Sequence, residues 1–153
     1  TSTPHRRIAL AVAAMWREQL GVRTHLVNEE WKVFVQNRRS GRLTEAFRGG
    51  WIADVADPLA FLEAFDGPGP NNWSGYTDAD YSRLLGEARA SAEPAERRRR
   101  FAVAERQLLQ SQPILPIYFY VSKHLVRDEV EGFVPNPLDR HPSRWMRLRE
   151  SAP

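Results

Sequence analysis

Two carboxylates three positions apart, Asp54 and Asp57, are the residues of this sequence best placed to do chemistry. Asp57 precedes Pro58, and an aspartate N-cap followed by a proline at the first helical position is a common helix start. Asp57 therefore has a structural role. Asp54 has none, and it lies on a glycine-rich turn beside Trp51 and close to Arg48. We expect Asp54 to meet a ligand; the alternative is a carboxylate that bonds the backbone of its own turn.

The elements before this turn must position it. Apolar spacing and residue alternation predict a helix, a strand, a helix and a strand, over residues 4–20, 22–28, 29–40 and 43–48. Gly21 stands where a left-handed C-cap belongs. Such a succession is typical of a parallel α/β layer, in which ligands bind beyond the carboxyl ends of the strands. The turn of Asp54 follows such an end.

The elements after the turn are less regular. A short helix over 59–65 leads into a Gly-Pro loop, and Thr77 is the expected N-cap of a helix that pairs with a second one over 94–110 as an antiparallel hairpin. The run 113–126 is bulky, rich in β-prone residues and nearly continuous, so it predicts a strand buried on both faces. A last strand is expected over 144–150.

Composition excludes several classes of protein. The 153 residues, 42% hydrophobic and 27% charged, suffice for one domain with a core. Cysteine is absent, which excludes thiol catalysis, disulfides and cysteine-ligated zinc. No apolar run reaches the ~18 residues of a membrane span, and no signal-peptide pattern opens the chain. From this we expect either a cytosolic protein or an interior piece of a longer chain.

Recognised catalytic motifs are missing as well. The sequence has no Gly-x-Ser-x-Gly elbow, no phosphate-binding glycine loop and no His-Glu-x-x-His, so we expect no enzyme and no cofactor. The histidines are scattered and lack ligand-spaced partners, which predicts no metal site; they are His5, His25, His124 and His141.

A run of four arginines, Arg97–Arg100, is the main signal for a different class of function, a basic adaptor that binds nucleic acid or an acidic protein. Consecutive helical residues point around the helix, however, and Glu93, Glu96 and Glu105 flank the run at helical spacing. A net charge of only +3 also gives little support to a nucleic-acid partner. We therefore favour a solvated helix surface.

An ordered set of motifs resembles one family. It comprises Gly21-Val22, Glu30-Trp31-Lys32, Arg38, Arg48-Gly49-Gly50-Trp51-x-Ala53-Asp54-x-x-Asp57-Pro58, Asn72, Pro116-x-Tyr118-x-Tyr120 and Asn136-Pro137-Leu138-Asp139. In this order they are similar to the C-terminal part of a bacterial oligopeptide-binding protein, the solute-binding component of a peptide ABC importer. The resemblance covers nearly the whole chain.

The resemblance implies an α/β fold: a periplasmic-binding-protein-like lobe with a mixed, largely parallel sheet flanked by helices, as a fragment of a two-lobed protein. Residues 1–121 would belong to the second lobe, and 122–153 would be a tail that returns to an absent first lobe. It also implies a periplasmic or cell-envelope location, an ABC permease as partner, no nucleic acid, and membrane association only through a missing N-terminus.

Residue roles follow from the same resemblance. Asp54 matches the aspartate that pairs with the α-ammonium of a bound peptide. Arg48 and Arg38 match arginines of the cleft, and Trp31 and Trp51 match its aromatic wall. A receptor for a dipeptide, a murein peptide or another small solute of the same superfamily is the alternative.

Overall fold

The computed structural model describes residues 2–43 and 45–149, in two compact units divided between Phe47 and Arg48. The first unit contains α1 (Thr3–Leu20) and α2 (Trp31–Arg39). Gly21 ends α1 with φ 67°, and its N–H donates to the Arg17 carbonyl, as the sequence predicts. At the start of α2, the Glu30 carboxylate accepts the N–H groups of Lys32 and Val33.

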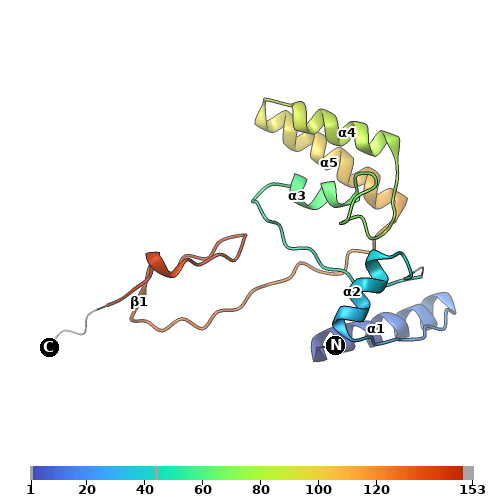
Figure 1. The fold of residues 1–153 in the computed structure, drawn as a ribbon, viewed down its shortest axis with the longest axis horizontal. Coiled ribbons are helices and arrows are strands. Elements are labelled where there is room, and N and C mark those ends of the chain that lie inside the picture. Colours follow the sequence, from blue (N-terminus) through green and yellow to red (C-terminus); the bar gives the residue numbers. More distant parts are fainter. Residues whose placement is uncertain (1, 44, 150–153) are drawn as a thin grey trace. The chain divides into compact units, whose positions relative to one another are not determined.

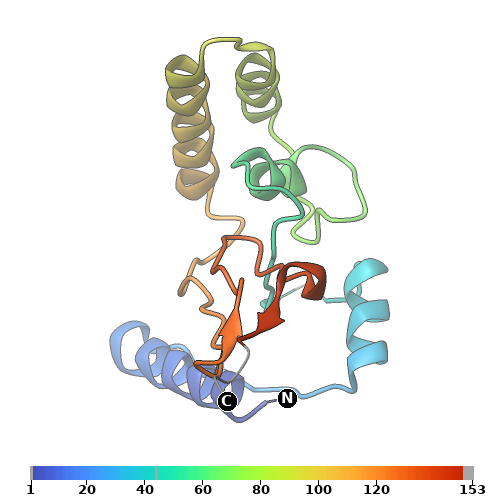
Figure 2. The same cartoon turned by 90° about the vertical axis from the view of Figure 1, so that its left-hand side faces the viewer.

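The second unit is built on a block of helices. Its elements are α3 (Leu59–Leu62), the 3-10 turn η1 (Glu63–Phe65), α4 (Ala79–Ala90) and α5 (Pro94–Ser111). Helices α4 and α5 run side by side, joined by a short turn, which confirms the predicted hairpin (Figures 1 and 2). The N-cap of α4 is Asp78, whose carboxylate accepts the Tyr81 N–H; the expectation of Thr77 is wrong by one position, because the acceptor three residues before Tyr81 is Asp78.

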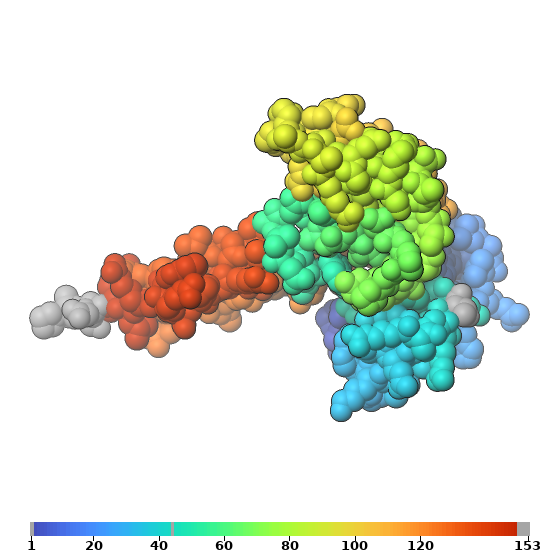
Figure 3. All heavy atoms as spheres, turned by 45° about the horizontal axis from the view of Figure 1, so that its top comes forward, coloured from blue at the N-terminus to red at the C-terminus, as the bar shows by residue number. Residues whose placement is uncertain are grey.

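The core of the described residues lies among α3, α4 and α5. Its fully or nearly fully buried members are Leu62, Tyr81, Leu85, Ala88, Phe101, Ala104 and Leu108. The atoms of α4 and α5 are in direct contact along the hairpin (Figure 3). One polar group enters this core: the Tyr81 hydroxyl donates to the Leu62 carbonyl over 2.7 Å and so ties α4 to α3. Burial raises the pKa of that hydroxyl, which keeps it a donor.

The predicted strands differ most from the structure. Segments 22–28, 43–48 and 113–126 form no ladder among the described residues, whose sheet consists of β1 (Val130–Glu131) antiparallel to β2 (Arg147–Leu148). The largely parallel sheet expected of the whole lobe is therefore not formed within the described residues. The physical reason is that a strand needs a neighbour for its N–H and C=O groups, whereas helices α1 to α5 satisfy their own.

Exposure shows how far these segments are from a finished sheet. Phe119, at the centre of the strongest predicted strand, is 98% exposed, and Val27 is 81% exposed. Near the end of the chain, the expected strand 144–150 shrinks to β2, preceded by the 3-10 turn η2 (Ser143–Trp145), and its last residue Glu150 lies outside the described residues.

Helix α1 also carries apolar side chains without a partner surface: Leu10, Met15 and Leu20 are at least half exposed. Among the described helices, none combines the length and apolar character that a bilayer crossing demands.

The Tyr81 hydrogen bond yields the first prediction. Tyr81→Phe leaves the buried Leu62 carbonyl without its donor, so the free energy of unfolding should fall by about 1–2 kcal/mol. Urea denaturation followed by circular dichroism measures this change. Tyr118→Phe is the matched control, because Tyr118 is 52% exposed and should tolerate the same deletion. Equal stability of the two variants would contradict a structural role for the bond.

Candidate functional site

The turn that begins at Arg48 is fixed to the helical block through Asp57. Its Oδ1 accepts the N–H of Leu59, the first residue of α3, at 2.8 Å. The Arg97 guanidinium adds two further bonds, Nη1 to Oδ2 at 2.7 Å and Nη2 to Oδ1 at 3.0 Å. These arginine bonds, together with the bond from Leu59, hold the pKa of Asp57 below its usual range despite partial burial. The predicted structural role of Asp57 is confirmed, and Arg97 is the partner that the sequence did not reveal.

Trp51 provides a second anchor for the turn. Its indole N–H donates to the Ala60 carbonyl over 2.7 Å, so the side chain reaches from the turn to α3. Its ring meets Trp73 edge to face at 5.7 Å between centroids. Trp51 remains partly exposed. It therefore combines a structural contact with a partly exposed ring.

Asp54 lies between these anchors and stays outside the contacts that they make. Its side chain is 88% exposed. It forms a long ion pair with Arg140, with 3.9 Å between Arg140 Nη2 and Asp54 Oδ1, and the Arg140 side chain is itself 63% exposed. Such an exposed, long pair contributes little to stability. The structure thus separates the two aspartates as local chemistry predicts: Asp57 is engaged and Asp54 is presented to solvent.

Two other residues of the predicted site, Trp31 and Arg38, lie on α2 in the first unit, and both contact the ring of Phe34. Trp31 stacks on Phe34 with 5.8 Å between centroids and is 62% exposed. The Arg38 guanidinium lies over the same Phe34 ring at 5.4 Å, and burial followed by the charge of Arg39 lowers its pKa. A shallow hollow of ≈ 530 Å³ runs along α2 beside Trp31. The structure describes this group separately from the turn of Arg48, Trp51 and Asp54.

Most arginines of the run on α5 form ion pairs. Besides Arg97 with Asp57, Arg99 pairs with Glu96, and Arg100 pairs with Glu96 and Glu87. Arg98 is exposed. These contacts agree with the solvated helix surface that we favoured and leave little free positive charge for a nucleic-acid backbone.

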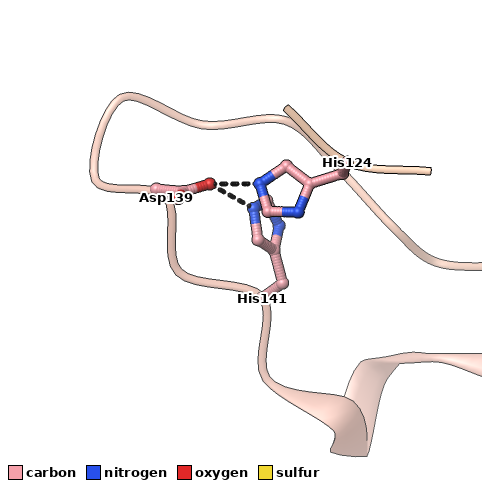
Figure 4. A group of neighbouring side chains, drawn as sticks. All are labelled: His124, Asp139 and His141. Atoms are coloured by element: carbon pink, nitrogen blue, oxygen red, sulfur yellow. Dashed lines mark hydrogen bonds and ion pairs between the residues drawn. The ribbon is translucent and has the colours of Figure 1, made fainter. Parts of the chain in front are cut away.

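One cluster is brought together that the sequence analysis missed. His124 Nε2 lies 2.6 Å and His141 Nε2 2.9 Å from the same oxygen, Oδ1 of Asp139 (Figure 4). Bonds from Ser122, His141 and His124 hold the pKa of Asp139 below its usual range. Spacing along the sequence did not reveal this pair, because the chain returns on itself between positions 124 and 141. The one sequence signal was the Asn136-Pro137-Leu138-Asp139 turn.

The Asp57–Arg97 pair gives a second prediction. Arg97→Met should lower the urea midpoint at neutral pH more than Arg98→Met does, because only Arg97 closes the turn onto α5. The pKa of Asp57 is lowered in the folded state, so its contribution is full above the ordinary aspartate pKa of ~3.9 and is lost as pH falls through the lowered value. The gap between the two variants should therefore close in acid. A gap that persists or grows below that pH would show that charge pairing is not its cause.

Known proteins give this geometry a context. No family model matches the chain. The periplasmic oligopeptide-binding protein OppA of Salmonella typhimurium is 36% identical over 140 residues, 91% of this chain and 26% of the relative. The periplasmic murein peptide-binding protein MppA of Escherichia coli is 33% identical over 147 residues, 95% of this chain and 27% of the relative. The chain thus spans about a quarter of the length of the curated relatives that it matches.

Solved structures agree. The E. coli murein tripeptide binding protein MppA superposes with a TM-score of 0.87 at 32% identity, over 99% of this chain and 30% of that one. Haemophilus influenzae OppA, in complex with RPPGFSPFR, superposes with a TM-score of 0.82 at 29% identity, over 98% of this chain and 30% of that one. The family resemblance noted from the motifs is confirmed, and the fold is that of part of a periplasmic-binding-protein lobe. The chain is a segment of an OppA-like solute-binding protein.

Proposed function

We propose that this chain supplies part of the peptide-binding lobe of a substrate-binding protein that serves a peptide ABC importer. The relatives support this by what they bind: oligopeptides, murein peptides and, in Bacillus subtilis DppE at 32% identity, dipeptides. They are binding proteins, which supports a role without catalysis. Their periplasmic names support a periplasmic location.

The observation that carries the proposal is the unequal use of the two turn aspartates. Asp57 is satisfied by Leu59 and Arg97, whereas Asp54 is 88% exposed and has a distant partner in Arg140. A carboxylate on an anchored turn suits a ligand cation, because its position is fixed and no strong partner must be displaced. The α-ammonium of a peptide is such a cation, and the two ions attract strongly once closure removes water from between them.

The remaining predicted site residues have side-chain chemistry that suits a peptide. Trp31 and Trp51 present aromatic surface for its side chains, while Arg38 and Arg48 supply cations for its carboxylate, directly or through water. In this proposal residues 1–121 belong to the binding lobe, and 122–153 form the segment that returns to a second lobe. Closure of the two lobes about a hinge would bury the peptide and present both lobes to the permease.

A receptor for dipeptides or another small solute is the alternative in the same class, favoured by relatives such as DppE and the probable deoxycholate-binding protein YgiS of E. coli. A basic adaptor is disfavoured, because Arg97, Arg99 and Arg100 already have acidic partners.

The test uses tryptophan fluorescence of the full-length protein during titration with trialanine. Asp54→Asn removes the charge without changing the shape of the side chain. We expect it to raise the Kd about a hundredfold or more, because it would leave the ammonium without its counter-ion. N-acetyltrialanine should bind the wild type equally poorly. Acetylation should cost the variant little more, since both changes remove the same ion pair.

Asp128→Asn is the matched control, an exposed aspartate outside the turn whose loss should leave the Kd unchanged. Unchanged affinity for trialanine in Asp54→Asn together with unchanged affinity for the acetylated peptide would refute the assignment of Asp54. Sensitivity to acetylation alone would assign the ammonium to a different carboxylate. Tight binding of a non-peptide solute with no response to trialanine would favour the alternative receptor.

A further inference from the structure

We propose that His124, Asp139 and His141 form a binding site for a divalent transition-metal ion, with Zn²⁺ as its best occupant. One ligand atom from each residue lies within 4.8 Å of the other two (Figure 4). The cluster shares no residue with the proposed peptide-binding site, and the peptide-binding proposal does not depend on it.

The separations suit a small cation. At a tetrahedral zinc ion, bonds of ~2.0–2.2 Å to nitrogen and oxygen place neighbouring ligand atoms about 3.3–3.6 Å apart. Asp139 Oδ1 is 2.6 Å from His124 Nε2 and 2.9 Å from His141 Nε2. These two separations therefore need to widen by about 0.4–1 Å, as two hydrogen bonds are replaced by three bonds to the metal.

The ligands are held in place before any ion arrives. The Phe133 ring stacks on His141 with 4.2 Å between centroids and lies 5.2 Å from His124, so one aromatic ring packs against both imidazoles. Asp139 has φ 52°, in the left-handed region that aspartate tolerates, and Asn136 secures the turn by accepting from the N–H groups of Leu138 and Arg140. Such preorganisation lowers the cost of binding.

The type and number of ligands select the ion. Two imidazoles and one carboxylate favour zinc or its neighbours over Mg²⁺ and Ca²⁺, which prefer oxygen donors. Three protein ligands leave a coordination position open for water. The side chains of His124 and Asp139 are 38% and 40% exposed, so solvent and ions have access, while His141 at 11% forms the inner wall.

A bound ion would cross-link two parts of the chain. It would join the extended segment at His124 to the Asn136 turn and so restrain a part of the chain that lacks a ladder partner among the described residues. Since the ion binds only the arranged ligands, its binding would add to the stability of this region.

The experiment titrates Zn²⁺ into the full-length, tag-free, chelator-treated protein by calorimetry, and repeats the titration with Co²⁺ while recording visible absorption. We expect saturable binding at one ion per chain, ligand-field bands from Co²⁺, and no heat from Mg²⁺ at the same concentration. His124→Gln and His141→Gln should each weaken Zn²⁺ binding by more than about tenfold, since even changes outside the ligand set cost ~10–100-fold.

His25→Gln is the matched control, because His25 is exposed and lies outside the cluster; it should bind Zn²⁺ as the wild type does. Absence of saturable Zn²⁺ binding to the wild type would overturn the proposal, as would affinity that both cluster variants retain. The Co²⁺ spectrum of the wild type tests imidazole ligation even if a cluster variant fails to fold, and a spectrum of hydrated Co²⁺ alone would also overturn the site.

Discussion

The bidentate bond between Asp57 and Arg97 fixes the turn of Asp54 to the helical block. It joins a turn, which has no regular hydrogen bonding of its own, to the longest helix of the helical block. Trp51 adds its bond to Ala60, so the turn is held on both sides of Asp54. Because both anchors use other residues, the Asp54 side chain stays exposed to solvent. The exposure of one acid thus follows from the full engagement of the other.

Local signals in the sequence predicted the helices well. Gly21 marks the end of α1, and the stripe of Phe101, Ala104 and Leu108 on α5 is buried as its spacing indicates. The strands could not be predicted to the same degree. A run of β-prone residues indicates that a segment can form a strand, but it does not identify the strand that it pairs with. Phe119 shows this: its sequence context is that of a central strand, and the structure leaves it exposed. The family assignment, made from motifs, does not depend on those pairings.

The candidate sites divide in the same way. The roles of Asp54 and Asp57 could be distinguished from the sequence, because Asp57 followed directly by Pro58 is a local signal for a helix start. The partner of Asp57 could not be predicted, because nothing in a run of four arginines indicates which one faces a turn 40 residues away. The pair of His124 and His141 was missed for a related reason. Spacing rules look for ligands on one helix, whereas these two histidines are 17 residues apart in an irregular segment. A turn around Asn136 brings them together at Asp139, which is 15 residues from His124.

The helical block has a consequence for how the chain folds. Its contacts join α3, α4 and α5, which follow one another directly, so little loop entropy is lost in forming them. Such a block can assemble early, while the segments 22–28 and 113–126 still wait for distant partners. The order of events would then run from the α4–α5 hairpin outward, with the β-prone segments docking last. The anchored turn would already be in place on the block before segment 113–126 pairs.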